Sequence, residues 1–405
     1  MVATAGSLSV FGDIVGSEHV RAANPDDAIG GVLPSTVVAP ADEAEVAAVL
    51  AAASAHHMAV VTRGGGTKLD WGAPPTRCDV ILSTSRIEGI VDHEPADLVC
   101  VARAGTPLAV LQKQLASTQG FRQRLMLDPP HGDGATLGGV VATAASGSLR
   151  TRFGTPRDLV IGASFVLADG TVGRSGGKVV KNVAGFDVAK LLVGSLGTLA
   201  VITEIAFRLH PLPSASRTVV LESRSVDDLC AFARAVGRMQ VTPNVVDLHW
   251  PEGVAVVRFD SSERGADVQA RRVTAEIGGR VLEGPDELAM TDELVGSVWR
   301  GLGDVAALAV LPSHVGPLLT SMSGGICDAI LLRPLLGTGE VRFASAEAGA
   351  VRAAVRNAGG RLLTRRGDEQ PGGSPDDVAL DLMRSVKRRL DPAGTLSPGR
   401  YIGGI

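Results

Sequence analysis

Three glycine-rich stretches, far apart in the chain, carry the residue types that bind a phosphorylated ligand. The first is a short apolar run at residues 60–62 that leads into Gly64, Gly65, Gly66 and Thr67. Successive glycines leave backbone N–H groups free to point at an anion, because no Cβ stands in the way. A diphosphate fits such a cradle.

The other two stretches leave room for a flat group. Thr136 stands just before Gly138 and Gly139, which open a run of small residues at 140–146 suited to close backbone approach. The third stretch is GSLGTL at residues 194–199. An isoalloxazine or adenine ring would fit beside the small residues. Together the three stretches predict a site for a flavin dinucleotide.

Length and composition exclude several other classes of function. A chain of 405 residues is long enough for two or three domains, each with its own core. The 39 basic and 43 acidic residues give a net charge of −4 with no long run of either sign, so no nucleic-acid or membrane-surface partner is predicted. Four scattered cysteines and the lack of any apolar run of about 18 residues predict a cytoplasmic protein without direct membrane insertion. Any membrane association would run through a partner.

Alternating elements position the first two stretches. The sequence predicts a strand at 36–38, a helix at 43–55 and a strand at 59–62 that ends at the first glycine loop. Asp42 and Glu45 form a capping-box pattern where that helix begins. Further predicted elements are strands at 80–82, 98–102, 159–167 and 199–209, a strand resuming at 172, and a helix near 107–114.

The pattern changes after residue 213. Predicted helices at 226–236 and 266–277 flank strands at 245–250 and 254–259, a β-α-β-β-α character typical of a second domain. Residues 367–377 are polar and rich in Pro and Gly, and an amphipathic helix is predicted at 378–390. No internal repeat is evident in the sequence.

Six short motifs follow one another in a fixed order. They are RGGGTK at 63–68, DPPH with ATLGG at 128–139, GTPRD at 154–158, VKNVAGFD at 180–187, VGSLGTL at 193–199 and DPAGTLSPGR at 391–400. A glycine triplet or pair alone is more often a plain turn or a helix start. All six in order resemble the vanillyl-alcohol-oxidase, or PCMH-type, FAD-binding flavoproteins, most closely the FAD-binding subunits of bacterial glycolate oxidases.

The resemblance implies an α+β fold, with a PCMH-type FAD-binding domain of two α/β subdomains and a smaller α+β cap domain. The expected organisation is an N-terminal segment at 1–33, the FAD-binding domain at 34–213, the cap or substrate domain at 214–370, and a C-terminal linker, helix and tail at 371–405 that return to the FAD domain.

The resemblance also implies which residues bind FAD. The loop at 63–69 would hold the diphosphate, residues 136–139 and 142–147 would line the dinucleotide, and residues 197–202 would cover the adenine and ribose. Some relatives attach FAD through a histidine in the first loop; because Gly66 and Thr67 stand there, noncovalent FAD is predicted. The predicted cofactor-binding residues are Arg63, Gly64, Gly65, Gly66, Thr67, Lys68, Leu69, Pro130, His131, Thr136, Leu137, Gly138, Gly139, Ala142, Ser146, Gly147, Gly197, Leu199, Ile202 and Arg400.

The reaction implied is two-electron oxidation of a small 2-hydroxy acid. The α-hydrogen would leave as hydride to the flavin, a base would take the hydroxyl proton, and a cation would hold the carboxylate. Catalytic relatives carry histidine and glutamate clusters in the second domain; the sequence has no such cluster, and no metal site is predicted. The catalytic residues are therefore unknown, with Lys181, His249, Arg300 and Arg333 as candidates.

Each candidate has a structural alternative. His249 lies in an alternating strand, where a histidine is more often structural. Arg300 and Arg333 follow apolar residues and could hold a carboxylate, but exposed or interface positions suit them as well. Lys181 follows an extended stretch and equally fits a role in holding the loop after it.

Three functions stay open at this point. The chain could be a dehydrogenase subunit working with a sister flavin subunit and an iron–sulfur subunit, since it lacks the paired cysteines of a cluster site. It could be a noncatalytic FAD-binding assembly or electron-relay subunit, which Leu196 favours because catalytic sister chains carry glutamate there. It could also be a standalone FAD oxidase or dehydrogenase of another alcohol or acid.

Ser397 departs from the asparagine of many relatives, which affects one contact near the tail.

Overall fold

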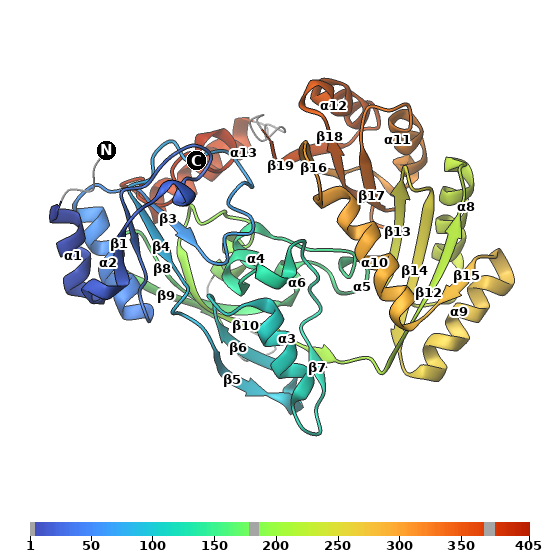
Figure 1. Cartoon of the computed structure of the whole chain (residues 1–405), viewed down its shortest axis with the longest axis horizontal. Helices are drawn as coiled ribbons and strands as arrows, with labels where there is room; N and C mark the ends of the chain where they lie inside the picture. Colours follow the sequence, from blue (N-terminus) through green and yellow to red (C-terminus); the bar gives the residue numbers. More distant parts are fainter. Residues whose placement is uncertain (1–4, 178–185, 368–376) are drawn as a thin grey trace. The chain divides into compact units, whose positions relative to one another are not determined.

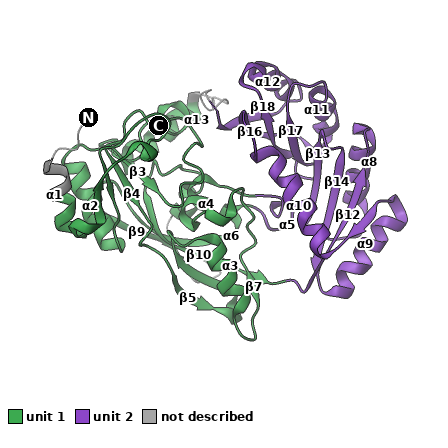
Figure 2. Ribbon diagram, viewed as in Figure 1, with its two compact units in different colours: residues 1–146, 155–212, 374–405 green, residues 147–154, 213–373 purple. Residues whose placement is uncertain are grey.

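The computed structural model describes residues 5–177, 186–367 and 377–405. The chain forms two compact units (Figure 2). The first comprises residues 1–146, 155–212 and 374–405, and the second comprises 147–154 and 213–373. The short segment 147–154 is thus grouped with the second unit, although it lies inside the range 34–213 expected for the FAD-binding domain. No helix in the described ranges is both long and apolar enough to span a bilayer.

A four-stranded sheet in the first unit leads into the first glycine loop (Figure 1). Its strands, in spatial order, are β1 (Val20–Ala22), β2 (Thr36–Val38), β4 (Val80–Ser83) and β3 (Val60–Arg63). The last three run parallel, and β1 is antiparallel to β2. Helices α1 (Ala5–Val15) and α2 (Glu43–Ala55) pack together beside this sheet, and the predicted helix at 43–55 is confirmed.

Helix α2 begins at the predicted cap. Asp42 Oδ1 accepts a hydrogen bond of 2.9 Å from the Glu45 amide, and the Glu45 carboxylate accepts one of 2.7 Å from the Ala41 amide. These acceptors satisfy N–H groups that a helix start leaves unpaired. Val46 and Val49 on the inner face are fully buried, so α2 fixes the crossover that places β3 beside β4.

The second sheet of the first unit is antiparallel and five-stranded. Its strands, in spatial order, are β5 (Ile90–Glu94), β6 (Val99–Arg103), β10 (Val201–Arg208), β8 (Val160–Val166) and β9 (Val172–Gly176). A small pair joins β7 (Gln123–Arg124) to β11 (His210–Pro211). The helices of this part are α3 (Leu108–Ser117), α4 (Leu137–Thr143), α6 (Pro156–Leu159) and α7 (Val188–Leu192). The strands predicted near 98–102, 159–167, 172 and 199–209 are all found.

The C-terminal tail joins the edge of the first sheet. After helix α13 (Asp377–Leu390), Leu396 forms a parallel bridge with Val60 of β3. The Val60 amide donates to Thr395 O at 2.7 Å, and the Ser397 amide donates to Val60 O at 2.8 Å. The last residues of the chain therefore support the strand from which the glycine loop emerges.

A buried ion pair fixes this tail. Lys387 Nζ of α13 lies 2.6 Å from Asp391 Oδ2 and also donates to Thr198 O at 2.7 Å and Leu396 O at 2.8 Å. The Asp391 carboxylate accepts further hydrogen bonds from the Thr395 and Leu396 amides. One lysine thus connects the helix, the tail and the third glycine stretch.

The second unit contains a repeat that the sequence does not reveal. One β-α-β-β-α-β half consists of β12 (Ala215–Glu222), α8 (Val226–Arg238), β13 (Val245–Trp250), β14 (Val254–Ser261), α9 (Glu263–Ile277) and β15 (Arg280–Leu282). The other consists of β16 (Asp304–Ala309), α11 (Val315–Met322), β17 (Ala329–Arg333), β18 (Thr338–Phe343), α12 (Ala348–Asn357) and β19 (Arg361–Arg366), and α10 (Gly284–Trp299) connects them. Different apolar residues satisfy the same pattern in each half, so no sequence repeat is visible.

The two halves form one antiparallel sheet of eight strands in the order β15-β12-β14-β13-β17-β18-β16-β19. The second strand of each half meets the other at the centre, where Leu248 of β13 is paired with Leu332 of β17. The main core lies on the face covered by α8, α9, α11 and α12. On the opposite face Leu294 of α10 packs against Val220 and Val254.

The buried pair of the tail generates a stability prediction. Asp391→Asn removes the carboxylate that neutralises Lys387, and an ammonium group left unpaired in the interior is costly, so we expect the first unit to lose about 3–5 kcal/mol of unfolding free energy. Thermal unfolding of cofactor-free protein, followed by circular dichroism, measures the loss. Asp381→Asn on the same helix is the control, because that carboxylate is 77% exposed. Equal small shifts in both variants would contradict the role assigned to the pair.

Candidate cofactor site

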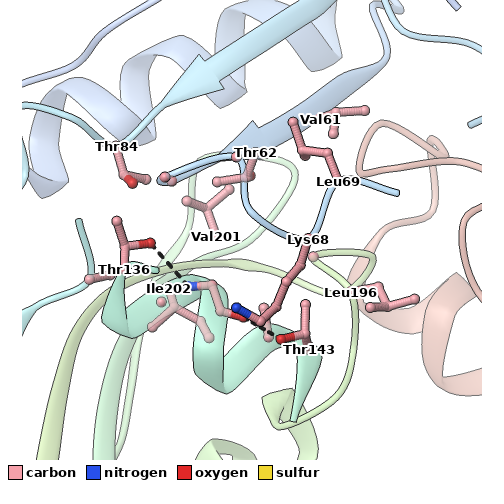
Figure 3. A pocket seen from close by; sticks show the side chains of 18 of the residues that line it. Val61, Thr62, Lys68, Leu69, Thr84, Thr136, Thr143, Leu196, Val201 and Ile202 are labelled. Carbon is pink, nitrogen blue, oxygen red and sulfur yellow. Dashed lines mark hydrogen bonds between the residues drawn. The ribbon is translucent and has the colours of Figure 1, made fainter. Parts of the chain in front are cut away.

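The three glycine stretches meet around one pocket in the first unit (Figure 3). The pocket and its mouth together hold about 780 Å³ of space not filled by atoms, a volume that includes open solvent. Its walls come from the end of β3 and the loop after it, from α4, and from the start of β10. The residues that line it are Val61, Thr62, Gly64, Gly65, Gly66, Thr67, Lys68, Leu69, Thr84, Ala104, Ala135, Thr136, Gly138, Gly139, Ala142, Thr143, Leu196, Gly197, Ala200, Val201, Ile202 and Arg400.

The first glycine loop presents a row of unpaired N–H groups to the pocket. Within the described ranges, the amides of Gly65, Gly66, Thr67 and Lys68 donate to no protein acceptor. Unpaired amides of this kind need a ligand or water as acceptor. Four in succession suit the oxygens of a diphosphate.

Gly65 is required by the close approach of the first two stretches. A Cβ at Gly65 would lie 1.8 Å from Gly134 O, and one at Gly64 would lie 2.0 Å from Thr136 Oγ1. No side chain fits in either space. By contrast, a Cβ at Gly132 would meet nothing within 4 Å. The second stretch therefore packs closely against the loop, and residues 64–69 of that loop line the pocket.

Helix α4 is seated against the end of β6. The Gly138 amide donates to Ala104 O at 2.7 Å, and the Leu137 amide donates to Thr106 O at 3.0 Å. A Cβ at Gly138 would lie 2.9 Å from the Ala104 Cβ. The predicted Gly138-Gly139 pair thus serves close backbone packing, and it brings the first turn of α4 to the pocket wall.

Two cationic side chains line the pocket. The Lys68 Nζ lies 3.2 Å from Thr67 Oγ1 and 5.8 Å from the centre of the Trp71 ring. Figure 3 shows the Lys68 side chain crossing the pocket towards Thr143 of α4. Burial lowers the pKa of Lys68 to about 8, and the charge of Asp70 acts in the opposite direction.

Arg400 reaches the same loop from the C-terminal tail. Its Nη2 donates to Leu69 O at 2.9 Å and to Trp71 O at 2.6 Å, while its buried Nη1 has no acceptor. Only 3% of Arg400 is exposed, and burial lowers the pKa of its guanidinium. Leu196, in the left-handed region with φ of 53°, lines the pocket nearby in the third stretch.

Arg63 was expected to bind the cofactor, but its side chain lies elsewhere. Arg63 Nη1 pairs with Asp27 Oδ1 at 2.7 Å, and Arg21 Nη1 pairs with Asp27 Oδ2 at 2.6 Å. Hydrogen bonds from Arg21, a backbone bond from Asn24 and the bond from Arg63 hold the pKa of the buried Asp27 carboxyl well below its ordinary value. Arg63 therefore anchors the base of the loop, through a partner that lies 36 residues earlier in the chain.

Other expected residues also fall outside the lining. Leu137 and Leu199 are buried, His131 is exposed at a backbone φ of 54°, and Gly147 belongs to the second unit. The predicted residues that do not line the pocket are Arg63, Pro130, His131, Leu137, Ser146, Gly147 and Leu199. Thr143, Ala200 and Val201 line the pocket and fall within the expected ranges 142–147 and 197–202. The lining residues outside every expected range are Val61, Thr62, Thr84, Ala104, Ala135 and Leu196. These are ordinary residues at element ends, and only the fold brings them together.

The structure brings two catalytic candidates together and separates a third. His249 of β13 and Arg333 of β17 are each only 2% exposed, and Arg333 Nη1 pairs with Glu340 Oε2 at 2.9 Å. Burial, reinforced by the charge of Arg333, lowers the pKa of His249 to about 3, so its imidazole is neutral. Arg300 is exposed and pairs with Asp292 at 2.6 Å.

The fourth candidate, Lys181, lies outside the described residues. In the part of the chain that is described, no group of three His, Cys, Asp or Glu side chains is placed to hold a metal ion.

The glycine loop follows β3 of the sheet with parallel strands, and β10 of the antiparallel sheet lines the same pocket. A loop suited to a diphosphate, placed between two such sheets, is typical of FAD-binding domains. Residues 34–176 match the FAD binding domain family, and residues 373–401 match the C-terminal domain of FAD linked oxidases. The solved structure of p-cresol methylhydroxylase superposes with a TM-score of 0.73 at 16% identity, covering 98% of this chain and 97% of that one. The α+β PCMH-type fold is confirmed by this likeness.

Relatives of similar sequence indicate more closely which FAD-binding proteins this chain resembles. Glycolate oxidase subunit GlcE of Escherichia coli K12 is 32% identical over 350 residues, covering 84% of this chain and 92% of that protein. A D-lactate dehydrogenase of Archaeoglobus fulgidus is 41% identical, covering 56% of this chain and 50% of that protein. Glycolate oxidase subunit GlcD of Bacillus subtilis is 32% identical, covering 48% and 41%. The chain belongs to the family of FAD-linked oxidoreductases that contains these glycolate oxidase subunits, and its cofactor is FAD.

The tight loop contact generates a prediction about FAD retention. Gly65→Ala places a Cβ where Gly134 O lies, so the two loops must separate and the row of amides must shift. We expect FAD affinity to fall at least about tenfold, which corresponds to about 1.4 kcal/mol. Titration of apoprotein with FAD, followed by flavin fluorescence, measures this. Gly132→Ala in the same region is the matched control, and unchanged affinity in both variants would refute the loop assignment.

The Asp27 pair generates a pH prediction. Because its folded-state pKa is depressed, the carboxylate stabilises the fold at pH above the ordinary value of 3.8, and this contribution is lost as the pH falls through the folded-state pKa. Asp27→Asn should therefore lower the melting temperature at pH 7, with a gap to the unsubstituted protein that narrows below about pH 4. Asp26→Asn, at an exposed neighbour, is the control. A gap independent of pH would contradict the ion-pair explanation.

Proposed function

We propose that this chain is the FAD-binding subunit of a dehydrogenase that oxidises a small 2-hydroxy acid. The observation that carries the proposal is the row of unpaired amides from Gly65 to Lys68 at the wall of the pocket. Support for the substrate class comes from the relatives, whose names include glycolate oxidase subunits and a D-lactate dehydrogenase. FAD would supply the hydride acceptor, and the loop of this chain would hold its diphosphate.

We propose further that FAD is bound noncovalently. None of the described residues that line the pocket is a histidine, cysteine or tyrosine, the nucleophilic side chains that a covalent flavin link would use. His131, one of the predicted cofactor-binding residues, does not line the pocket. The cofactor would then be held by amides, by charge and by packing.

Electrons must leave the flavin through a partner in this proposal. Cys78, Cys100 and Cys230 are buried, and no group of three His, Cys, Asp or Glu side chains in the described ranges is placed to hold a metal ion. The described part of the chain therefore offers no grouped thiolates of the kind that hold an iron–sulfur cluster. A sister flavin subunit and an iron–sulfur subunit are the proposed partners.

A specific observation favours a second candidate, a noncatalytic FAD-binding assembly or electron-relay subunit. Substrate oxidation needs a cation for the substrate carboxylate. Arg333 is already paired with Glu340, and Arg300 with Asp292. If neither arginine exchanges its partner for substrate, the sister subunit would bind the hydroxy acid.

Anaerobic addition of glycolate or D-lactate to the purified chain separates the two candidates. We expect the protein to carry flavin absorbance that acid precipitation releases entirely into the supernatant, and we expect the hydroxy acid to bleach that absorbance. Flavin that stays oxidised would support the noncatalytic candidate instead. A coloured pellet would refute noncovalent attachment, and failure to bind FAD after reconstitution would refute the site.

A pair of arginine variants then tests the substrate contact. If Arg333 holds the carboxylate, Arg333→Gln should slow bleaching at least about tenfold with FAD still bound, as expected for loss of one charged hydrogen bond. Arg300→Gln is the exposed control. Because Arg333→Gln leaves Glu340 buried without its partner, the double variant Arg333→Gln/Glu340→Gln guards against misfolding. If Arg333→Gln and the double variant both bleach at the rate of the unsubstituted protein, Arg333 is excluded as the cation that binds the substrate carboxylate.

A further inference from the structure

Lys68 and Arg400 line the pocket, and the charge of Asp70 acts on both without forming an ion pair with either side chain. Within the described ranges, no carboxylate lies within ion-pair distance of either side chain. None of the described residues that line the pocket is an aspartate or glutamate. Lys68 is 7% exposed and Arg400 is 3% exposed. Two buried positive charges that face one cavity are costly unless an anion compensates them.

Both cations contact Trp71, in the turn that follows the glycine loop. The Trp71 amide donates to Lys68 O, and the Lys68 ammonium stands over the Trp71 ring. Arg400 Nη2 binds Trp71 O from the other direction, which leaves the buried Nη1 without an acceptor. An N–H donor that is buried, charged and unpaired at a pocket wall indicates a ligand acceptor.

We propose that Lys68 and Arg400 form a cation pair that recognises the two negative charges of the FAD diphosphate and selects FAD over uncharged riboflavin. The proposal rests on the proposed FAD site and deepens it. The loop amides orient the phosphate oxygens, and the two side chains match their total charge. Amides alone carry only partial charges, so charge discrimination falls to Lys68 and Arg400.

A pH dependence follows from the burial of Lys68. With a pKa near 8 in the absence of ligand, its ammonium is partly deprotonated at pH 9. A bound dianion favours the protonated form, so binding must take up a proton and affinity falls as the pH rises above 8. Asp70 raises the pKa of Lys68 and also acts on Arg400, and Cys78 faces Arg400 as a protonated thiol. Lys68 is the group among these that titrates between pH 7 and 9.

The test is a titration of apoprotein with FAD, riboflavin and ADP at pH 7 and pH 9. For the unsubstituted protein we expect FAD and ADP to compete, riboflavin to bind far more weakly, and FAD affinity to fall between the two pH values. Lys68→Met should weaken FAD and ADP at least about tenfold, leave riboflavin within about twofold, and abolish the pH dependence. Lys113→Met, at an exposed lysine of α3, is the charge-matched control.

Arg400 is tested with Arg400→Lys as well as Arg400→Met, because loss of the whole side chain also frees the Leu69 and Trp71 carbonyls. Arg400→Met should weaken FAD more than riboflavin, and Arg400→Lys should restore part of the loss. Equal losses for FAD and riboflavin would indicate a structural role and overturn the cation pair. FAD binding that is unaffected in Lys68→Met overturns it too, while leaving the site intact. Failure of the unsubstituted protein to bind FAD would refute the site itself.

Discussion

The contact between the first two glycine stretches is the constraint on which the site depends. Gly65 lies so close to Gly134 O that a single added carbon would force the loops apart. In the loop held by this contact, the amides from Gly65 to Lys68 donate to no acceptor among the described residues, and all four residues line the pocket. The parallel strands lie beneath the loop, and helix α4 lies opposite it. Together they hold the two backbone segments in contact. The backbone sets the shape of the site, and charged side chains add to it.

Both ends of the chain support that loop. From the N-terminal segment, Asp27 binds Arg63 at the base of the loop. From the C-terminal tail, Leu396 pairs with Val60 beneath it, and Arg400 holds the carbonyls that follow it. Residues 1–33 and 374–405, which the sequence sets apart from the FAD-binding range, are grouped with most of that range in one compact unit. Retention of FAD therefore depends on residues remote from the binding motif.

The sequence predicted those features that local physics decides. Helix α2, its Asp42 cap and the strand before the glycine loop follow from periodicity and capping. The loops themselves were recognisable because glycine is needed where backbones approach closely. The ion pair of Arg63 with Asp27 was not foreseen, because the two residues are distant in the chain. The pairing of Arg333 with Glu340 and the burial of His249 also required the fold. The structural repeat in the second unit was not predicted, because different apolar residues form the same β-α-β-β-α-β pattern in each half.

The parallel bridge between Leu396 and Val60 has a consequence for biosynthesis. Domains generally fold as units while the ribosome extends the chain from its N-terminus. Here the strand before the glycine loop gains its edge partner, and the pocket gains Arg400, from residues more than 300 positions later in the chain. The cofactor pocket is thus incomplete until those distant residues have been synthesised. Loading of FAD therefore comes late in the synthesis of this domain, well after the glycine loop itself has emerged.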